Sequence, residues 1–339
     1  MTSHHYYLRV LLLLMGAGLR AQTAPPDPMI RKMVAEVSPD RISATIKTLV
    51  GFETRGNYSD PNQKNRGNGA ARRWIFDQMH GYSSRLEVSY DTTKKDTTDI
   101  VTVIAVLAGL EKPEQRIIVS AHYDSINLRV TGARAAEAPA PGADDDASGI
   151  AVVLELARVM SRYRFSKTIV FIAFGGEEIG LVGSTRYASR AKANREQIEA
   201  VFNNDIVGAN VMGVAHNDVD GSDDLVAGDG DTGNRLRVYS PDPPASPSRR
   251  IARLLQEAAG RYVPGLHIEL MTTADRYGRG SDHLPFQTSG FAAVRLTSAS
   301  EHSNTQHTAD DVPEEVSPAF TADVARANGA AIATLAMPR

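Results

Sequence analysis

Apolar residues recur along this chain in two alternating patterns, which predict helices and buried strands. Spacings of three or four residues indicate amphipathic helices, whereas short β-branched runs without that period indicate strands buried on both faces of a sheet. The helical pattern covers 28–49 (two helices, divided at Pro39), 70–80, 148–163, 181–191, 248–262, 282–287 and 318–335. Strands are predicted at 100–107, 116–121, 168–174, 200–205, 236–239, 267–271 and 292–296. This alternation predicts an α/β fold with a mainly parallel sheet and helices on both faces.

The first 21 residues differ from this pattern and resemble a signal peptide. An apolar run of ten residues, 10–19, follows Arg9 and leads to Ala21 and a proline-rich stretch. That run is far shorter than the ~20 residues a permanent membrane-spanning helix needs. We therefore expect cleavage after Ala21, a secreted or periplasmic location, and a mature chain, 22–339, that forms a single domain without a transmembrane segment. An uncleaved N-terminal anchor is the alternative.

Composition excludes several classes of protein. The 339 residues include no cysteine, so disulfides, thiolate metal sites and cysteine nucleophiles are absent. The 37 basic and 40 acidic residues leave a net charge of -3, which is not the positive surface that nucleic-acid binders carry. We expect a monomer that binds no nucleic acid. Any metal must be held by histidine, aspartate or glutamate.

Acidic residues and a histidine follow several of the predicted strands. The chemistry-bearing residues are His122 and Asp124 after one strand, Asp144 to Asp146 before a helix, Glu177 and Glu178 after a second strand, and Asp205 at the end of a third. Because the carboxyl ends of parallel strands meet at one edge of a sheet, we expect these side chains to converge. Buried carboxylates would repel one another unless a cation neutralised them.

Each of these groups also has an ordinary explanation when taken alone. An aspartate before a helix is usually a cap, and acidic residues in a first turn complement the helix dipole. Their convergence favours a metal, and the histidine favours zinc over calcium or magnesium. Two later histidines, His302 and His307, could complete the ligand set. His307 is close in sequence to Asp311, which could orient its imidazole as Asp124 could orient that of His122.

Five separated strings resemble those of co-catalytic zinc exopeptidases of the secreted bacterial leucyl aminopeptidase type. They are His-Tyr-Asp-Ser from 122, Pro-Gly-Ala-Asp-Asp-Asp-Ala-Ser-Gly from 141, Glu-Glu-Ile-Gly-Leu-Val-Gly-Ser from 177, Asn-Asn-Asp from 203 and Gln-His-Thr from 306. They follow the family's order. The resemblance implies a three-layer α/β/α fold with a mixed, mainly parallel central sheet, the zinc exopeptidase fold.

The same resemblance assigns roles within a site of two zinc ions. It implies that Asp145 bridges the ions, with a cis peptide bond between Asp145 and Asp146. His122 and Asp205 would complete one ion's ligands, and Glu178 and His307 those of the other. Glu177 would be the general base.

A further segment, 275–283, resembles the family region whose tyrosine stabilises the carbonyl oxyanion, which makes Tyr277 a candidate catalytic residue. The spacing from Tyr277 to Ser281-Asp282-His283 differs from the family's by one residue, and the cysteines that flank this tyrosine in some relatives are absent. A loop tyrosine with a solvated hydroxyl is the alternative. For Asp282 and His283, helix capping is the simpler explanation.

The sequence thus predicts a secreted zinc-dependent aminopeptidase that hydrolyses peptides with a free N-terminus. Two metals can activate a water and clamp the scissile carbonyl, while Glu177 transfers the proton. The alternatives are a glutaminyl cyclase-like acyltransferase with one zinc, a carboxypeptidase or dipeptidase on the same scaffold, and a non-catalytic binding module. The preferred N-terminal residue is left open.

Overall fold

The computed structural model describes residues 25–208, 234–241, 246–276, 278–301 and 304–338. The predicted signal peptide, 1–21, and the candidates Tyr277 and His302 lie outside these residues. Within the described part of the chain, no helix combines the length and apolarity that crossing a membrane requires.

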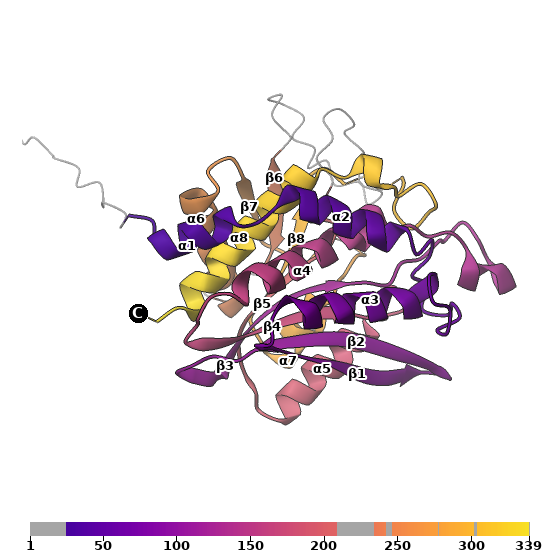
Figure 1. Cartoon of the computed structure of the whole chain (residues 1–339), viewed down its shortest axis with the longest axis horizontal. Coiled ribbons are helices and arrows are strands. Elements are labelled where there is room, and N and C mark those ends of the chain that lie inside the picture. Colours follow the sequence, from indigo (N-terminus) through magenta and orange to yellow (C-terminus); the bar gives the residue numbers. More distant parts are fainter. Residues whose placement is uncertain (1–24, 209–233, 242–245, 277, 302–303, 339) are drawn as a thin grey trace, which may run out of the picture.

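One sheet of eight strands runs through the molecule in the order β1-β2-β4-β3-β5-β8-β6-β7 (Figure 1). The strands are β1 (Leu86–Lys95), β2 (Thr98–Leu107), β3 (Lys112–His122), β4 (Lys167–Phe174), β5 (Gln197–Asn204), β6 (Arg235–Tyr239), β7 (His267–Met271) and β8 (Ala293–Ser298). The central strands β4, β3, β5 and β8 are parallel, as are β6 and β7. The pairs β1–β2, β2–β4 and β6–β8 are antiparallel, so the sheet is mixed, as predicted.

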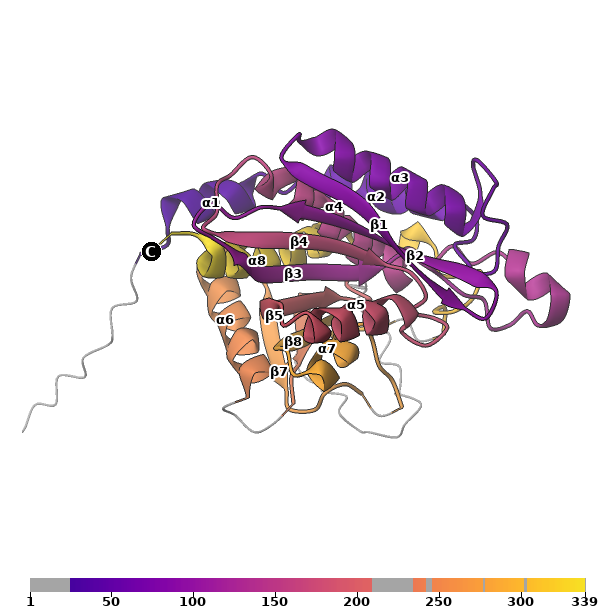
Figure 2. The same cartoon turned by 90° about the horizontal axis from the view of Figure 1, so that it is seen from below.

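Helices cover both faces of this sheet (Figures 1 and 2). Helices α5 and α7 lie on one face, and the other six lie on the opposite face. Their bounds are α1 (Pro28–Ala35), α2 (Pro39–Val50), α3 (Gly67–Tyr82), α4 (Gly149–Met160), α5 (Val182–Ala193), α6 (Pro247–Tyr262), α7 (His283–Ser289) and α8 (Pro318–Ala336). The predicted three-layer α/β/α architecture is therefore confirmed.

Three helices begin at a Ser-Pro pair, which sets their first turn locally. Ser38, Ser246 and Ser317 each accept a hydrogen bond from the backbone N–H three residues later. In each case the following proline occupies the first helical position, where it has no N–H to leave unpaired and its φ already suits a helix. These starts of α2, α6 and α8 are thus encoded by two adjacent residues.

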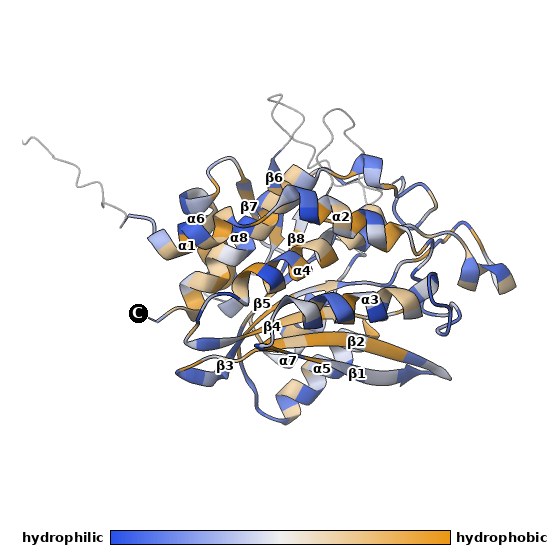
Figure 3. Cartoon of the chain, viewed as in Figure 1, coloured by the Kyte–Doolittle hydropathy of each residue, from blue (hydrophilic) through white to orange (hydrophobic). Residues whose placement is uncertain are grey.

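The central strands divide their side chains between two cores with a period of two residues. In β4, Ile169, Phe171 and Ala173 pack with the larger helical layer, whereas Val170, Ile172 and Phe174 pack under α5 and α7. Such strands are apolar on both faces, as Figure 3 shows by their colour. This explains why the predicted strands read as continuous apolar runs.

The sequence pattern did not predict the edge strand β1. Only Leu86 of its ten residues is buried, and the strand pairs with β2 alone. Most of its other residues are polar, including two threonines and two lysines, and their side chains are exposed or only partly buried. A strand with so little buried surface has a weak hydrophobic period.

Candidate metal centre

Three neighbouring parallel strands carry the candidate residues to one edge of the sheet. His122 is the last residue of β3, Glu177 and Glu178 follow β4, and Asp205 follows β5. Since β4, β3 and β5 run in the same direction, their carboxyl ends lie together. The convergence expected from strand ends is therefore found in the structure.

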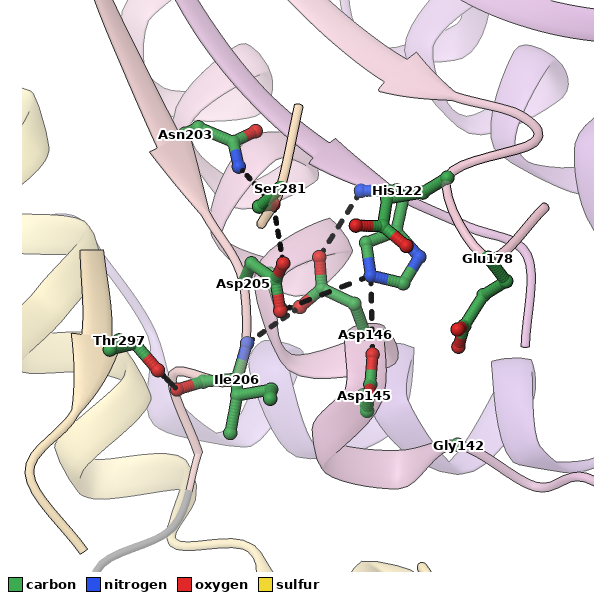
Figure 4. Close-up of polar contacts among 12 residues, drawn as sticks. His122, Gly142, Asp145, Asp146, Glu178, Asn203, Asp205, Ile206, Ser281 and Thr297 are labelled. Carbon is green, nitrogen blue, oxygen red and sulfur yellow. Dashed lines mark hydrogen bonds and ion pairs between the residues drawn. The ribbon is translucent and has the colours of Figure 1, made fainter. Parts of the chain in front are cut away.

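Asp145 lies between two imidazoles, with one carboxylate oxygen facing each. Its Oδ1 is 3.1 Å from Nε2 of His122, and its Oδ2 is 3.1 Å from Nε2 of His307. Glu178 Oε2 lies 3.2 Å from the same nitrogen of His307, and Asp205 Oδ1 lies 3.9 Å from Nε2 of His122. In Figure 4, Asp205 and Glu178 stand on opposite sides of His122. All five predicted ligands are thus brought together, in the arrangement a bridging carboxylate requires.

The electrostatics of this cluster indicate a shortage of positive charge. Burial raises the pKa of Glu178 to about 7 and holds the pKa of Glu177 well above its usual range. Burial alone would lower the pKa of His307, but its hydrogen bonds with Asp145 and Glu178 raise that pKa to about 11. Protons are therefore retained where carboxylates crowd together.

The donor set fits a zinc ion. Oε1 of Glu178 is buried and has no hydrogen-bond partner among the described residues, although a buried carboxylate oxygen normally has one. One or more cations at this point would take the place of the retained protons and neutralise the carboxylates. Zinc accepts imidazole nitrogen and carboxylate oxygen together, and both kinds of ligand are present here.

Asp124 holds the residues around the candidate metal centre in place through hydrogen bonds. Its carboxylate accepts hydrogen bonds from the backbone N–H groups of Glu177 and Glu178, at 3.2 and 3.1 Å, and from the side-chain amide of Asn57, at 2.6 Å. Nδ1 of His122 is 3.1 Å from the carbonyl oxygen of Asp124 and 3.7 Å from its Oδ1. Nε2 of His122 is thus directed at Asp145 by the backbone carbonyl of Asp124, whereas the carboxylate that was predicted to orient this imidazole lies beyond hydrogen-bond distance.

Asp311 makes a different contact from the one expected. Its two oxygens accept hydrogen bonds from the backbone N–H groups of Asp144 and Asp145, at 2.8 and 3.0 Å. It therefore holds the backbone of Asp145, whereas the sequence suggested that it would orient His307. His307 itself has a φ of +56°, and its carbonyl oxygen accepts a hydrogen bond from Leu128 N–H at 2.9 Å. Closeness in sequence did not translate into contact because the chain turns between the two residues.

The side chains of the three consecutive aspartates, 144–146, make three different sets of contacts. Asp144 accepts a hydrogen bond from Gly208 N–H at 2.8 Å, while Asp145 faces the imidazoles. Asp146 binds the N–H groups of His122, at 3.1 Å, and Gly149, at 2.9 Å, so the capping explanation applies to Asp146. The peptide bond between Asp145 and Asp146 is cis, as the resemblance implied.

Two residues that the sequence analysis missed hold Asp205. The hydroxyl of Ser281 donates to Asp205 Oδ2, and Asn203 donates to Ser281 at 2.7 Å. Nη2 of Arg295 lies 3.1 Å from Asp205 Oδ1, while its Nη1 lies 3.1 Å from Asp275 Oδ2. A charged residue inside the apolar run of β8 was a signal that could have revealed Arg295, because a buried arginine needs carboxylate partners.

Arg55 was also missed and organises the approach to Asp145. It is fully buried, and its guanidinium donates to the carbonyl oxygens of Tyr123 at 2.6 Å, Pro141 at 2.5 Å and Gly142 at 2.8 Å. These carbonyls belong to the two loops that carry Asp124 and Asp145. The loop around Arg55 is polar and rich in glycine, so nothing local marks this arginine as buried.

Helix capping does not explain Asp282 and His283. Both side chains are fully buried, and Asp282, which precedes α7, makes no capping hydrogen bond. Nε2 of His283 lies 2.7 Å from the carbonyl oxygen of Ala274 and 3.7 Å from Asp275. The capping hypothesis is therefore wrong for this pair: both side chains are buried, and His283 contacts the loop that contains Ala274 and Asp275.

The candidate ligands and Glu177 line a cavity of about 200 Å³. Three arginines, Arg276, Arg279 and Arg295, line the same cavity. A carboxylate oxygen of Glu177 lies within 4.8 Å of ligand atoms of His122 and Asp205, so Glu177 borders the metal centre.

The chain is similar to known zinc enzymes in both sequence and fold. The model of peptidase family M28 matches residues 102–332. A probable zinc metalloprotease of Pyricularia oryzae is 36% identical over 338 residues, which cover 92% of this chain and 67% of that protein. The LapA aminopeptidase of Legionella pneumophila has a TM-score of 0.68 at 20% identity, covering 91% of this chain and 75% of that one.

A glutaminyl cyclase of Macrostomum lignano has the same fold, with a TM-score of 0.68 at 17% identity, covering 92% of this chain and 94% of that one. Likeness at this identity concerns the fold alone, whereas the family match and the curated relative concern the sequence. With the histidine and carboxylate donors gathered at one edge of the sheet, they show that this chain belongs to peptidase family M28 and is a zinc metallopeptidase.

Proposed function

We propose that this metallopeptidase is an aminopeptidase that holds two zinc ions and removes the N-terminal residue of peptides. The observation that carries the proposal is the placement of Asp145, whose two oxygens face two different histidines. His122 and Asp205 would hold one ion, and Glu178 and His307 would hold the other. When bound, the zinc ions supply Lewis acidity toward the scissile carbonyl and lower the pKa of a water molecule.

Glu177 would act as the general base and acid. It is held by its backbone to Asp124, and its side chain borders the cavity without being needed as one of the five ligands. Burial raises its pKa, which favours its accepting a proton. In this proposal Glu177 takes a proton from the attacking water and delivers it to the leaving amine.

The acidic surroundings also support binding of a free amino group. The carboxylate of Glu177 faces the cavity and is not one of the five proposed ligands, so in its ionised form it would attract a protonated amine. An acylated N-terminus lacks that charge. This difference would restrict cleavage to the first residue of a peptide.

The test combines counted zinc with a substrate panel. Aminoacyl anilides and unblocked dipeptides should be hydrolysed with two zinc ions per chain, activity should disappear with a chelator, and zinc should restore it. N-acetylated counterparts should be inert. Activity on blocked peptides only would refute the aminopeptidase proposal in favour of a carboxypeptidase.

The variant Glu177→Gln tests the proton transfer. It should retain both zinc ions and lose about 10²–10⁴-fold in kcat, the usual contribution of a general base. Glu87→Gln, on the exposed edge strand β1, is the matched control and should behave as the wild type. Undiminished turnover by Glu177→Gln would remove Glu177 from the mechanism.

A glutaminyl cyclase-like acyltransferase is the second candidate, supported by the shared fold with the Macrostomum lignano enzyme. The two proposals differ in stoichiometry and in product. One zinc per chain, with cyclisation of peptides that begin with glutamine and no hydrolysis of anilides, would favour the cyclase.

We further propose that the protein is exported and loses residues 1–21. The support is the short apolar run before Ala21. Sequencing the N-terminus of the protein recovered from the producing cell should find Gln22 first, and a retained Met1 would refute cleavage.

A further inference from the structure

Two arginines, Arg276 and Arg279, line one wall of the cavity. The backbone N–H of Arg279 donates to the carbonyl oxygen of Arg276 at 3.2 Å. Gly278, which precedes Arg279, has a φ of +68°, a conformation that glycine adopts more readily than other residues.

The arginines differ in how their charge is balanced. Arg276 pairs with Glu301, and Arg295 pairs with Asp205 and Asp275. Arg279 donates to the neutral side-chain oxygen of Gln306, at 2.9 Å, and in the described ranges no carboxylate lies within ion-pairing distance of it. Its positive charge is therefore the one that the cavity lining leaves without an acidic partner, within the part of the chain described.

The position of Arg279 places that charge beside the reaction centre. Its partner Gln306 directly precedes the candidate ligand His307. Arg279 lines the same cavity as the candidate ligands, so an anionic group bound by it would lie close to the scissile bond. A guanidinium presents several parallel N–H donors, which suit a carboxylate better than any other group of a peptide.

The other residues that line the cavity also favour a charged substrate group over an apolar one. Among the described residues of the cavity wall, Ile206 supplies the one apolar side chain, and the others are charged, histidine or glycine. A pocket selective for a large apolar N-terminal side chain would present several apolar or aromatic groups. The described wall instead offers an unbalanced cation.

We propose that Arg279 is a specificity-determining residue that binds a carboxylate of the substrate, so that peptides carrying a carboxylate within one residue of the scissile bond are preferred. This inference rests on the proposed aminopeptidase function. The carboxylate has three possible sources: the side chain of an acidic first residue, the side chain of an acidic second residue, or the terminal carboxylate of a dipeptide.

Matched substrate pairs distinguish these sources in the zinc-loaded full-length enzyme. The Glu and Gln anilides test the first side chain, Leu-Glu-amide and Leu-Gln-amide test the second, and Leu-Gly and Leu-Gly-amide test the terminal carboxylate. At least one pair should show a preference of about tenfold in kcat/KM for the charged member. This is the scale of one charge-assisted hydrogen bond at an exposed guanidinium.

The variant Arg279→Gln should abolish that preference, so that it hydrolyses the charged and the uncharged member of the pair with equal kcat/KM. The loss should appear mainly in KM, because a contact to a remote carboxylate is made equally in the ground state and the transition state. Arg279→Lys should restore part of it. Arg261→Gln, an exposed arginine at the end of α6, is the matched control and should change nothing.

The two proposals fail in different ways. Hydrolysis of all three pairs without preference, or a preference that survives in Arg279→Gln, would overturn the role of Arg279 and leave the aminopeptidase proposal standing. Failure to hydrolyse any unblocked substrate would refute the aminopeptidase proposal, and the role of Arg279 with it.

Discussion

Replacing Arg55 tests how much the site depends on a residue that touches neither substrate nor metal ligands. Its guanidinium serves four buried carbonyl oxygens, those of Tyr123, Pro141 and Gly142 and, at 3.4 Å, that of Leu49. In Arg55→Met these oxygens lose a charged donor, while most of the buried volume is kept. Each hydrogen bond to a charged group contributes about 1.5–3 kcal/mol.

The net loss in the free energy of unfolding is smaller than the sum of these hydrogen bonds. Burial of Arg55 lowers its pKa despite nearby carboxylates, which shows that its charged form is desolvated at a cost. Breaking a buried charged network typically costs about 3–5 kcal/mol, and we expect a loss of that size in the free energy of unfolding. Arg55→Lys keeps the charge but not the planar fork, so it should fall between the methionine variant and the wild type.

Urea unfolding of the zinc-loaded protein measures this loss directly. The matched control is Arg129→Met, because Arg129 pairs with Asp310 at 2.8 Å on the surface, where both side chains are more than 60% exposed. Such pairs contribute about 0–1 kcal/mol. If Arg55→Met unfolds within 1 kcal/mol of the wild type, the organising role of Arg55 is wrong.

Three further predictions concern the metal centre. Asp145→Asn, which weakens the carboxylate between the two histidines, should lower the zinc content below that of the wild type by metal analysis; an unchanged content would contradict the bridging role. In the metal-free chain His122 and His307 are held protonated by their acidic neighbours, so zinc must displace protons and its apparent affinity should rise about tenfold or more per pH unit near neutrality. Calorimetry in buffers of different ionisation enthalpy checks this, and binding without proton release would refute it. Asp311→Ala leaves two buried N–H groups without an acceptor and should lower the free energy of unfolding by about 2–4 kcal/mol in urea, an effect that a merely surface carboxylate would not give.

The sequence pattern predicted helices and strands correctly where buried side chains recur at regular intervals or in continuous apolar runs. The central strands β2, β3, β4, β5 and β8 are buried on both faces and read as apolar runs. The edge strand β1 was not predicted, because its exposed side chains are mostly polar and give no apolar run. The same reasoning explains the site: residues at the carboxyl ends of neighbouring parallel strands were expected to meet, and His122, Glu178 and Asp205 do.

Contacts across long stretches of sequence could not be predicted in this way. Arg55 binds carbonyls about 70 and 90 residues away, and Arg295 reaches Asp205 from another strand. Asp311 was expected beside His307 but supports Asp145. The hydrophobic pattern of the sequence indicates whether a side chain is buried, but it does not indicate which residues that side chain contacts.

The sequence by itself determined the chemistry available to this protein. Without cysteine, the metal centre had to be built from imidazole and carboxylate, and the Ser-Pro pairs set the starts of three helices through local hydrogen bonds. Only the tertiary structure decided which oxygen of Asp145 faces which histidine, which aspartate supports its backbone, and which cavity arginine has no acidic partner among the described residues. Those outcomes depend on the packing of strands and loops distant in sequence, because an electrostatic interaction or a hydrogen bond acts over a few ångströms of space and takes no account of the number of residues between its partners.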